Sequence, residues 1–266
     1  MKCRIVPFGY YWTDTPQWDI DRARRKRNTD WVSALRTLPA TAPGKNRYVR
    51  FLKDRHQGKL PNGYHVSATE GLLHEKFKNV DWSDRQVKAD DITFLRIIAR
   101  ELYGLIGKET RRLDPDALIF GERYLVGDHP DVVLEEAMPY IDVLSIQPGG
   151  RTFNGPYFDK LHKRTGKPIL LCDHQCSFAV PDYPKTMWQQ LESEEAVGKA
   201  YAKYLDDSFQ KLYIIGYHRC QYIDRFAKHP GVLKQGLLRQ DGTPYKTLAK
   251  YTTEANEKAI RAFCEQ

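Results

Sequence analysis

The sequence lacks the long apolar runs, signal peptide and glycine-rich loops that mark several large classes of protein. No apolar run in its 266 residues approaches the ~20 residues that a membrane-spanning helix needs, so no membrane span is expected. The first residues lack the uninterrupted apolar stretch and the cleavage site of a signal peptide. A glycine-rich phosphate loop is missing too, which argues against a nucleotide cofactor. We therefore expect a soluble domain.

Cysteine is scarce and badly spaced for a metal site. Of five cysteines, only Cys172 and Cys176 lie close in sequence, at a C-x3-C spacing. A structural zinc site normally adds a second cysteine pair or paired histidines, and neither accompanies this pair. We expect these thiols in or near the core, and we expect no metal and no organic cofactor.

Acidic residues are outnumbered, with 34 Asp and Glu against 42 Lys and Arg, which gives a net charge of +8. Residues 22–27 form a compact basic block of the kind found in nucleic-acid-binding proteins. The other basic residues are scattered among acidic ones. We therefore interpret the block as a solvated helix or loop face and do not expect nucleic-acid binding. The same charge would attract an anionic polysaccharide through non-specific electrostatics.

Four short apolar runs each lead directly into polar or ionisable residues. They span residues 117–121, 142–146, 168–172 and 213–216, and helical patterns separate them. This alternation is typical of parallel strands that are buried on both faces and whose C-terminal ends share one side. In an α/β barrel that side carries the active site. The sequence therefore predicts an α/β fold of the (β/α)8 TIM-barrel type, with its chemistry at the strand ends.

The whole chain, residues 1–266, is interpreted as a single barrel domain. A first strand is expected at about 4–12, and a long insertion between strand and helix follows at about 15–115. Asp90 and Asp91 are expected to cap a helix that runs to about residue 112. Further helices are expected near 45–55, 130–138, 156–165, 193–211 and 245–263.

The predicted strands are too few to close a barrel. The sequence gives five clear strands and one doubtful piece at 64–66, whereas a closed barrel of this type needs eight. An open barrel would expose two edge strands, which isolated proteins usually avoid. Either the chain is the C-terminal part of a longer barrel, or a partner chain or an unusual insertion closes it.

Five segments form an ordered set of motifs. They are GYYWTDT at 9–15, DALIFGERY at 116–124, YIDVLSI at 140–146, GKPILLCDH at 166–174 and GYHRCQY at 216–222. In this order they resemble the last five strands of a β-agarase-type glycoside hydrolase, one of the clan-A retaining (β/α)8 barrels. The resemblance implies that the first three strands of the family are absent from this chain. It also implies a polysaccharide or oligosaccharide substrate and, because such relatives are usually exported, an extracellular or periplasmic parent protein.

Retaining glycoside hydrolases need two carboxyl groups about 5–5.5 Å apart, one a nucleophile and the other an acid that becomes a base. The resemblance places Asp173 at the position of the nucleophile, after the family's seventh strand. The Asn-Glu pair after the fourth strand is replaced by Asp14 and Thr15. Thr15 therefore stands at the acid/base position, where a hydroxyl cannot do this work near neutral pH. Either Asp14 takes over as the acid, or Glu122 reaches in from the next strand.

Other strand-end residues are candidate substrate ligands. Arg123 falls on the G-x-R position of the family, so the resemblance implies that it orients the nucleophile; an ion pair with Glu122 is the alternative. Four tryptophans are candidate stacking platforms for a sugar ring, with core packing as the alternative for each: Trp12, Trp18, Trp82 and Trp188. The residues expected to bind substrate are Trp12, Thr15, Arg123, Tyr124, Gln147, His174, His218 and Tyr222.

Three hypotheses about function follow. The first is a glycoside hydrolase that acts on a β-linked galactan or related polysaccharide by double displacement, with Asp173 as nucleophile and Asp14 or Glu122 as acid/base. The second is a carbohydrate-binding barrel whose carboxylates no longer form a working pair. The third is a basic polyanion-binding protein that uses residues 22–27. We favour the first.

Overall fold

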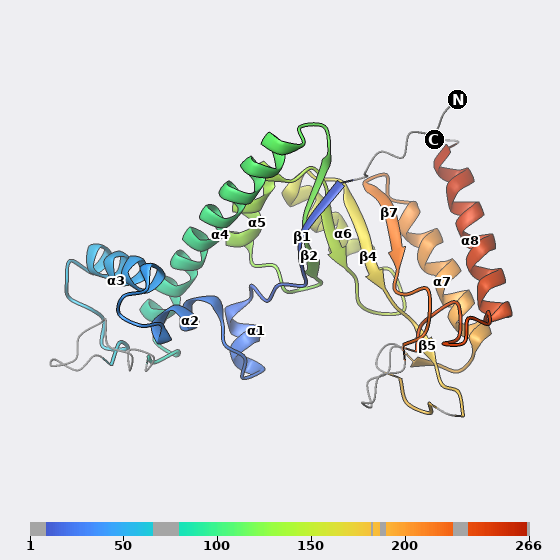
Figure 1. Cartoon of the computed structure of the whole chain (residues 1–266), viewed down its shortest axis with the longest axis horizontal. Coiled ribbons are helices and arrows are strands. Elements are labelled where there is room, and N and C mark those ends of the chain that lie inside the picture. Colours follow the sequence, from blue (N-terminus) through green and yellow to red (C-terminus); the bar gives the residue numbers. More distant parts are fainter. Residues whose placement is uncertain (1–8, 66–79, 182, 187–189, 226–233, 265–266) are drawn as a thin grey trace. The chain divides into compact units, whose positions relative to one another are not determined.

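The computed structural model describes residues 9–65, 80–181, 183–186, 190–225 and 234–264. These residues divide into two compact units (Figure 1). The sheet unit comprises Gly9–Thr15, Phe120–Val126 and the described residues from Asp142 onward. The helical unit comprises Pro16–Ile119 and Gly127–Ile141, and it includes the stretch of chain predicted to be a long insertion.

The centre of the sheet unit is a five-stranded parallel sheet in the order β1-β2-β3-β4-β7. Its strands are β1 (Gly9–Asp14), β2 (Leu118–Leu125), β3 (Leu144–Gln147), β4 (Ile169–His174) and β7 (Ile214–Arg219). The four apolar runs found in the sequence form β2, β3, β4 and β7, so the predicted parallel α/β fold is confirmed. Two short strands, β5 (Ser177–Phe178) and β6 (Gln190–Leu191), pair with each other in a separate sheet.

The central strands are apolar because both of their faces are covered. All four residues of β3 are buried, and β4 is buried at every position except Asp173. Hydrophobic burial on both faces stabilises such strands without any alternation of polar residues. In contrast, β1 lies at one edge and most of its side chains are exposed. The first strand was predicted at 4–12; its residues before Gly9 lie outside the described part of the chain.

Three long helices belong to the sheet unit: α6 (Gly155–Thr165), α7 (Glu194–Phe209) and α8 (Lys246–Cys264). Side chains cap two of them as expected for these residue types, since Asn154 accepts from the Tyr157 N–H and Ser193 from the Ala196 N–H. Gly198 lets α7 approach α8 closely, because a Cβ there would meet the Tyr251 side chain at 2.7 Å.

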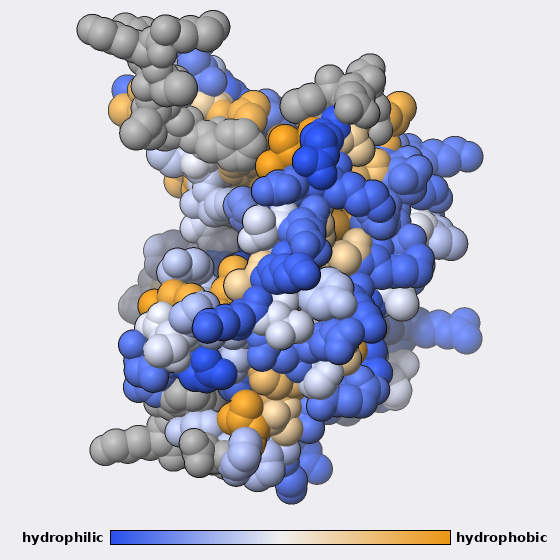
Figure 2. All heavy atoms as spheres, turned by 90° about the vertical axis from the view of Figure 1, so that its right-hand side faces the viewer, coloured by the Kyte–Doolittle hydropathy of each residue, from blue (hydrophilic) through white to orange (hydrophobic). Residues whose placement is uncertain are grey.

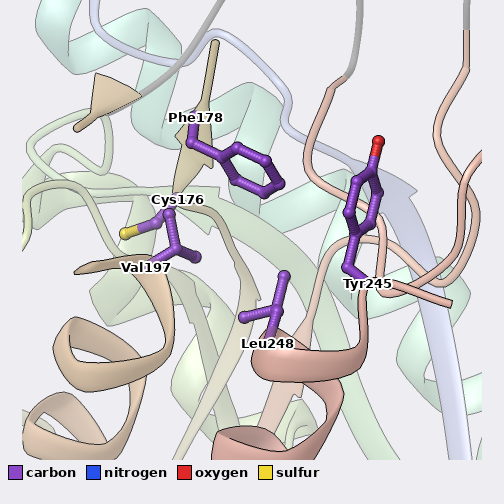
Figure 3. Close-up of a cluster of buried hydrophobic side chains, with 5 residues drawn as sticks. All are labelled: Cys176, Phe178, Val197, Tyr245 and Leu248. Carbon is purple, nitrogen blue, oxygen red and sulfur yellow. The ribbon is translucent and has the colours of Figure 1, made fainter. Parts of the chain in front are cut away.

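One apolar cluster joins β5 to the starts of α7 and α8 (Figure 3). Figure 3 shows the rings of Phe178 and Tyr245 beside the aliphatic side chains of Val197 and Leu248. Cys176 completes the cluster as a free, buried thiol. The cluster fixes the connection that follows β4, the strand whose C-terminal end carries Asp173.

The helical unit is built around the long helix α4 (Arg85–Leu113), which packs against three shorter helices. No described helix is long and apolar enough to span a membrane. The shorter elements are α1 (Ile20–Arg25), α2 (Trp31–Thr37), α3 (Pro43–His56), α5 (Asp131–Ala137) and the 3-10 turn η1 (Met138–Tyr140). The doubtful strand at 64–66 is reduced to a single antiparallel bridge between Tyr64 and Val80, and Val66 lies outside the described residues.

The predicted start of α4 was wrong. Its N-cap is Asp84, whose carboxylate accepts from the backbone N–H groups of Gln86 and Val87. Asp90 and Asp91 lie inside the helix and are fully buried. Their carboxylates accept hydrogen bonds from side chains distant in the sequence, and they do not cap the N–H groups at the start of the helix.

The basic block at 22–27 is divided between ion pairs and solvent. Arg24 contacts Asp30 at 3.1 Å and Asp91 at 2.8 Å, and Arg22 contacts Asp128 at 3.4 Å. The last three residues of the block are exposed. This arrangement agrees with the interpretation of the block as a helix face, and its ion pairs leave less free charge for a polyanion.

Candidate active site

A pocket of about 550 Å³ lies at the C-terminal ends of β1, β4 and β7, entirely within the sheet unit. It brings together six of the predicted site residues, which are Asp14, Asp173, Trp12, Arg123, His218 and Tyr222. Its other lining residues are Tyr11, Thr13, Cys172, Arg219, Cys220 and Gln221. Residues from both ends of the chain thus meet at one wall.

Arg123 connects the two carboxylates of the pocket. Its Nη2 atom donates to Asp14 Oδ1 and lies 3.4 Å from Asp173 Oδ2. Because one nitrogen contacts both carboxylates, the two side chains lie on either side of the same guanidinium. A retaining glycosidase needs two carboxyl groups about 5–5.5 Å apart. The Asp14 side chain is 69% exposed and that of Asp173 only 11%.

The backbone at Asp173 is unusual. Asp173 has φ of 57°, in the left-handed region that non-glycine residues seldom adopt. The pairing of β4 with β7 is irregular between Leu171 and His174, so the strand departs from regular geometry at this residue. Gln175 Nε2 donates to Asp173 Oδ2 at 3.3 Å. Strained backbone of this kind tends to occur at functional sites, where surrounding contacts maintain it.

Thr15 adjoins the pocket without lining it. It also has a left-handed backbone, with φ of 42°, and its N–H donates to the Arg123 carbonyl at 3.0 Å. This bond attaches the end of β1 to β2. The side chain next to it in sequence, Asp14, is the one that reaches Arg123.

Two predicted site residues of β2 lie away from the pocket. Glu122 is 2% exposed and Tyr124 is completely buried, and neither lines the pocket. Successive side chains of a strand point to opposite faces, so presenting Arg123 to the pocket turns both of its neighbours away. Tyr124 has no exposed surface in this arrangement, so its contact with substrate stays a prediction that the structure does not support. Arg123, for which an ion pair with Glu122 was the alternative, contacts Asp14 and Asp173.

His174 is a packed structural residue and not a ligand in the pocket. Its Nε2 lies 3.0 Å from the Gly150 carbonyl and its Nδ1 lies 2.5 Å from the Tyr217 hydroxyl. A carbonyl only accepts, so Nε2 carries the hydrogen and Nδ1 accepts from Tyr217. The ring also stacks on Tyr204, 3.9 Å between centroids. Burial lowers the pKa of His174 to about 4, so the ring is neutral near pH 7.

Gln147 is also buried, with 9% exposure, and lies outside the pocket lining. Its Oε1 atom has no hydrogen-bond partner among the described residues. The predicted contact of Gln147 with substrate is therefore not supported by this arrangement.

Aromatic side chains line the pocket on two sides. Trp12 and Tyr11 come from β1, and Tyr222, which is 66% exposed, follows β7. Trp18 and Trp82 belong to the helical unit, where Trp18 stacks on Trp31 and Trp82 stacks on the Arg24 guanidinium. Trp188 lies outside the described residues.

Sequence reasoning missed Tyr11, Cys172 and Cys220 as residues of the pocket. Tyr11 stacks on Phe120 with 5.0 Å between ring centroids. The apolar character of these residues pointed to the core, and only the pairing of the strands shows which of them reach the pocket. No cluster of three or more potential metal ligands occurs among the residues that the structure describes.

Comparison with known proteins gives a likeness of fold only. No family model matches the sequence, and no curated protein matches it either. Solved structures do: PfGH50B has a TM-score of 0.77 at 16% identity, over 96% of this chain and 38% of that one. An exo-β-agarase gives 0.77 at 17% identity, over 96% and 35%. The agarase AgWH50C gives 0.75 at 16% identity, over 96% and 37%.

These matches define a glycoside hydrolase-like fold. More particularly, the chain is similar in fold to agarases of known structure, in agreement with the resemblance found in its motifs. It spans little more than a third of the length of each of these three structures.

Proposed function

We propose that this chain is part of a glycoside hydrolase that cleaves a β-linked galactan or a related polysaccharide with retention of configuration. The observation that carries the proposal is the meeting of Asp14 and Asp173 around Arg123 in a pocket at the strand ends. Two adjacent carboxyl groups are what double displacement requires. The fold shared with agarases supports a galactan as the substrate class.

In the first step of the proposed mechanism, a carboxylate oxygen of Asp173 attacks the anomeric carbon of the sugar. The bond from that carbon to the leaving oxygen breaks, and Asp14 gives its proton to the leaving oxygen. In the second step, Asp14 takes a proton from water, and the water oxygen displaces Asp173 from the sugar. Glu122 was the alternative acid; we assign the role to Asp14 because Asp14 lines the pocket and Glu122 does not.

Arg123 would hold the nucleophile while the substrate enters. A sugar hydroxyl is a suitable replacement partner for the guanidinium on the Asp14 side. Trp12 and Tyr222 offer ring faces on which a sugar can stack, and His218 is an exposed hydrogen-bonding group on the same wall.

The proposal is tested by incubating the purified protein with agarose, porphyran, carrageenan and aryl β-galactosides. Wild type is expected to release product from at least one of them, whereas Asp173→Asn and Asp14→Asn release none. Asp207→Asn is a matched control, because Asp207 lies on the outer surface of α7 in an ion pair with Lys203. The absence of product on every substrate, from folded wild type and from the completed chimaera described below, would contradict the proposal.

A second candidate function is carbohydrate binding without hydrolysis. Two observations favour it: Arg123 contacts both carboxylates, and a threonine stands where the resemblance places the acid/base. In that case calorimetry would detect binding of galactan oligosaccharides by wild type, and Trp12→Ala would weaken it, with no product formed under any condition.

We further propose that additional βα units, on a longer form of this chain or on a partner chain, complete a barrel against β7. A groove of about 570 Å³ runs beside this edge strand, between α7 and α8, and its apolar lining includes Leu205, Phe209 and Ile215. Ile260 of α8 lines the groove and is 63% exposed, although the surface seen in Figure 2 is mostly hydrophilic. A parallel strand added here would bury this surface and pair the open edge.

Completion of the barrel is tested with a chimaera that carries the first three βα units of the exo-β-agarase before residue 9. Backbone amides of β7 are expected to exchange with deuterium more slowly in the chimaera than in the chain alone. Equal exchange rates in two folded proteins would contradict it.

A further inference from the structure

The thiol of Cys220 lies in the pocket wall beside Asp173. The ends of β4 and β7 are paired here, with His174 opposite Arg219, and the Cys220 N–H donates to the His174 carbonyl at 3.1 Å. This pairing sets the residue after β7 next to the carboxylate at the end of β4. Both side chains line the same pocket.

The hydrogen-bond partners of the thiol fix its direction. Gln235 Nε2 donates to the Cys220 sulfur at 3.1 Å, so the sulfur is an acceptor on that side. The thiol also interacts with the carboxylate of Asp173, which lines the same pocket. An ionised carboxylate only accepts, so the S–H group is the donor to Asp173.

The protonation state of the thiol agrees with this direction. Burial first, and then the hydrogen bond to Asp173 and its negative charge, raise the pKa of Cys220 to about 11. The thiol therefore keeps its proton at neutral pH and remains a donor.

We propose that Cys220 is a positioning residue that holds the Asp173 carboxylate at the wall of the pocket. In its catalytic part this inference rests on the proposed function, because Asp173 is the proposed nucleophile. Aspartate is one methylene shorter than the glutamate that the resemblance leads one to expect at this position. A small rotation of its side chain therefore moves the carboxylate away from the reacting carbon more readily than in glutamate. Arg123 and Gln175 both contact Oδ2, and the thiol adds a third contact from the opposite strand.

The contact itself is tested without any activity measurement, by alkylation of the folded protein with iodoacetamide at about pH 9 and mass spectrometry of the Cys220 peptide. Asp173→Asn removes the negative charge that disfavours the thiolate, so Cys220 is expected to react several-fold faster than in wild type. Cys176, buried in the apolar cluster of Figure 3, is an internal control whose rate stays unchanged. Asp207→Asn is the matched surface control. An unchanged Cys220 rate in Asp173→Asn would overturn the inference.

The positioning role is tested by comparing Cys220→Ala with Cys220→Ser. Loss of one hydrogen bond to a charged group is expected to lower kcat about tenfold in Cys220→Ala, with KM little changed, and Cys220→Ser should recover most of it because the hydroxyl donates to the same carboxylate. Wild-type kcat in Cys220→Ala would overturn the role. If the alkylation result holds while neither wild type nor the chimaera hydrolyses any galactan, the proposed function fails and the Cys220–Asp173 contact stands.

Discussion

Both units of this protein combine arginine with aspartate, yet the two combinations differ in what surrounds them. In the helical unit, Asp91 is 1% exposed and receives Arg24, Arg36 and the Tyr48 hydroxyl. In the sheet unit, a single guanidinium, that of Arg123, serves both Asp14 and Asp173 at the wall of an open pocket. Arginine–aspartate ion pairs thus hold helices together in the helical unit. In the sheet unit they lie at an open pocket, where the carboxylate oxygens can also accept hydrogen bonds from a ligand.

Removing a carboxylate should therefore affect activity in one unit and stability in the other. Asp173→Asn is expected to lower kcat at least about a thousandfold, because it removes the proposed nucleophile. The free energy of unfolding should change by less than about 1 kcal/mol, since asparagine tolerates the left-handed backbone and the lost ion pair is partly exposed. Kinetics and urea unfolding on one preparation measure both. A large loss of stability would place Asp173 with the structural carboxylates.

The converse change is Asp91→Asn in the helical unit. It leaves Arg36, which is completely buried, without its carboxylate, and the expected loss of stability is about 3–5 kcal/mol. Denaturant unfolding measures the loss, and Asp21→Asn, in the exposed pair with Lys88, is the control. Galactan hydrolysis per folded molecule should stay at the wild-type value, because Asp91 is not a residue of the sheet unit.

The buried His174 gives the sheet unit a pH dependence of its own. The pKa of His174 is about 4 in the folded chain, below its ordinary value of 6.5, so the unfolded chain binds the extra proton first as pH falls. This contribution to stability is complete above about pH 6.5 and is lost toward pH 4, with a total of about 3 kcal/mol at most. Unfolding free energies measured between pH 7 and 4 should fall less steeply in His174→Gln. An identical slope in this variant would show that His174 does not titrate as described.

The smallest expected effect concerns an exposed ion pair on α7. Lys203 and Asp207 are four residues apart, with a distance of 2.7 Å between Nζ and Oδ1, and their side chains are 69% and 37% exposed. Lys203→Ala should change the free energy of unfolding by no more than about 0.5 kcal/mol. A change as large as that of Asp91→Asn would remove the distinction between buried and exposed pairs.

Much of the sheet was predictable because local pattern determines it. Each central strand is a continuous apolar run followed by polar residues, and burial on both faces is the physical cause of that pattern. The same rule located Asp14, Arg123 and Asp173 at the strand ends.

The face of the sheet on which each side chain lies was harder to predict. Gly121, with φ of 66°, and Asp173, with φ of 57°, interrupt the regular alternation of β2 and β4. Near these points the choice between Glu122 and Arg123, or between Asp173 and His174, depends on backbone geometry that the sequence pattern does not contain. The start of α4 was missed for a related reason, since Asp90 and Asp91 resemble a cap until their distant arginine partners are known.

The most direct test of the central claim is to trap the proposed covalent intermediate. The protein would be incubated with a 2-deoxy-2-fluoro-β-galactosyl fluoride, which slows breakdown of a glycosyl-enzyme, and then digested for mass spectrometry. One added sugar is expected, attached to Asp173 and absent from Asp173→Asn. A sugar attached to another carboxylate, or none on a folded protein that cleaves galactan, would contradict Asp173 as the nucleophile.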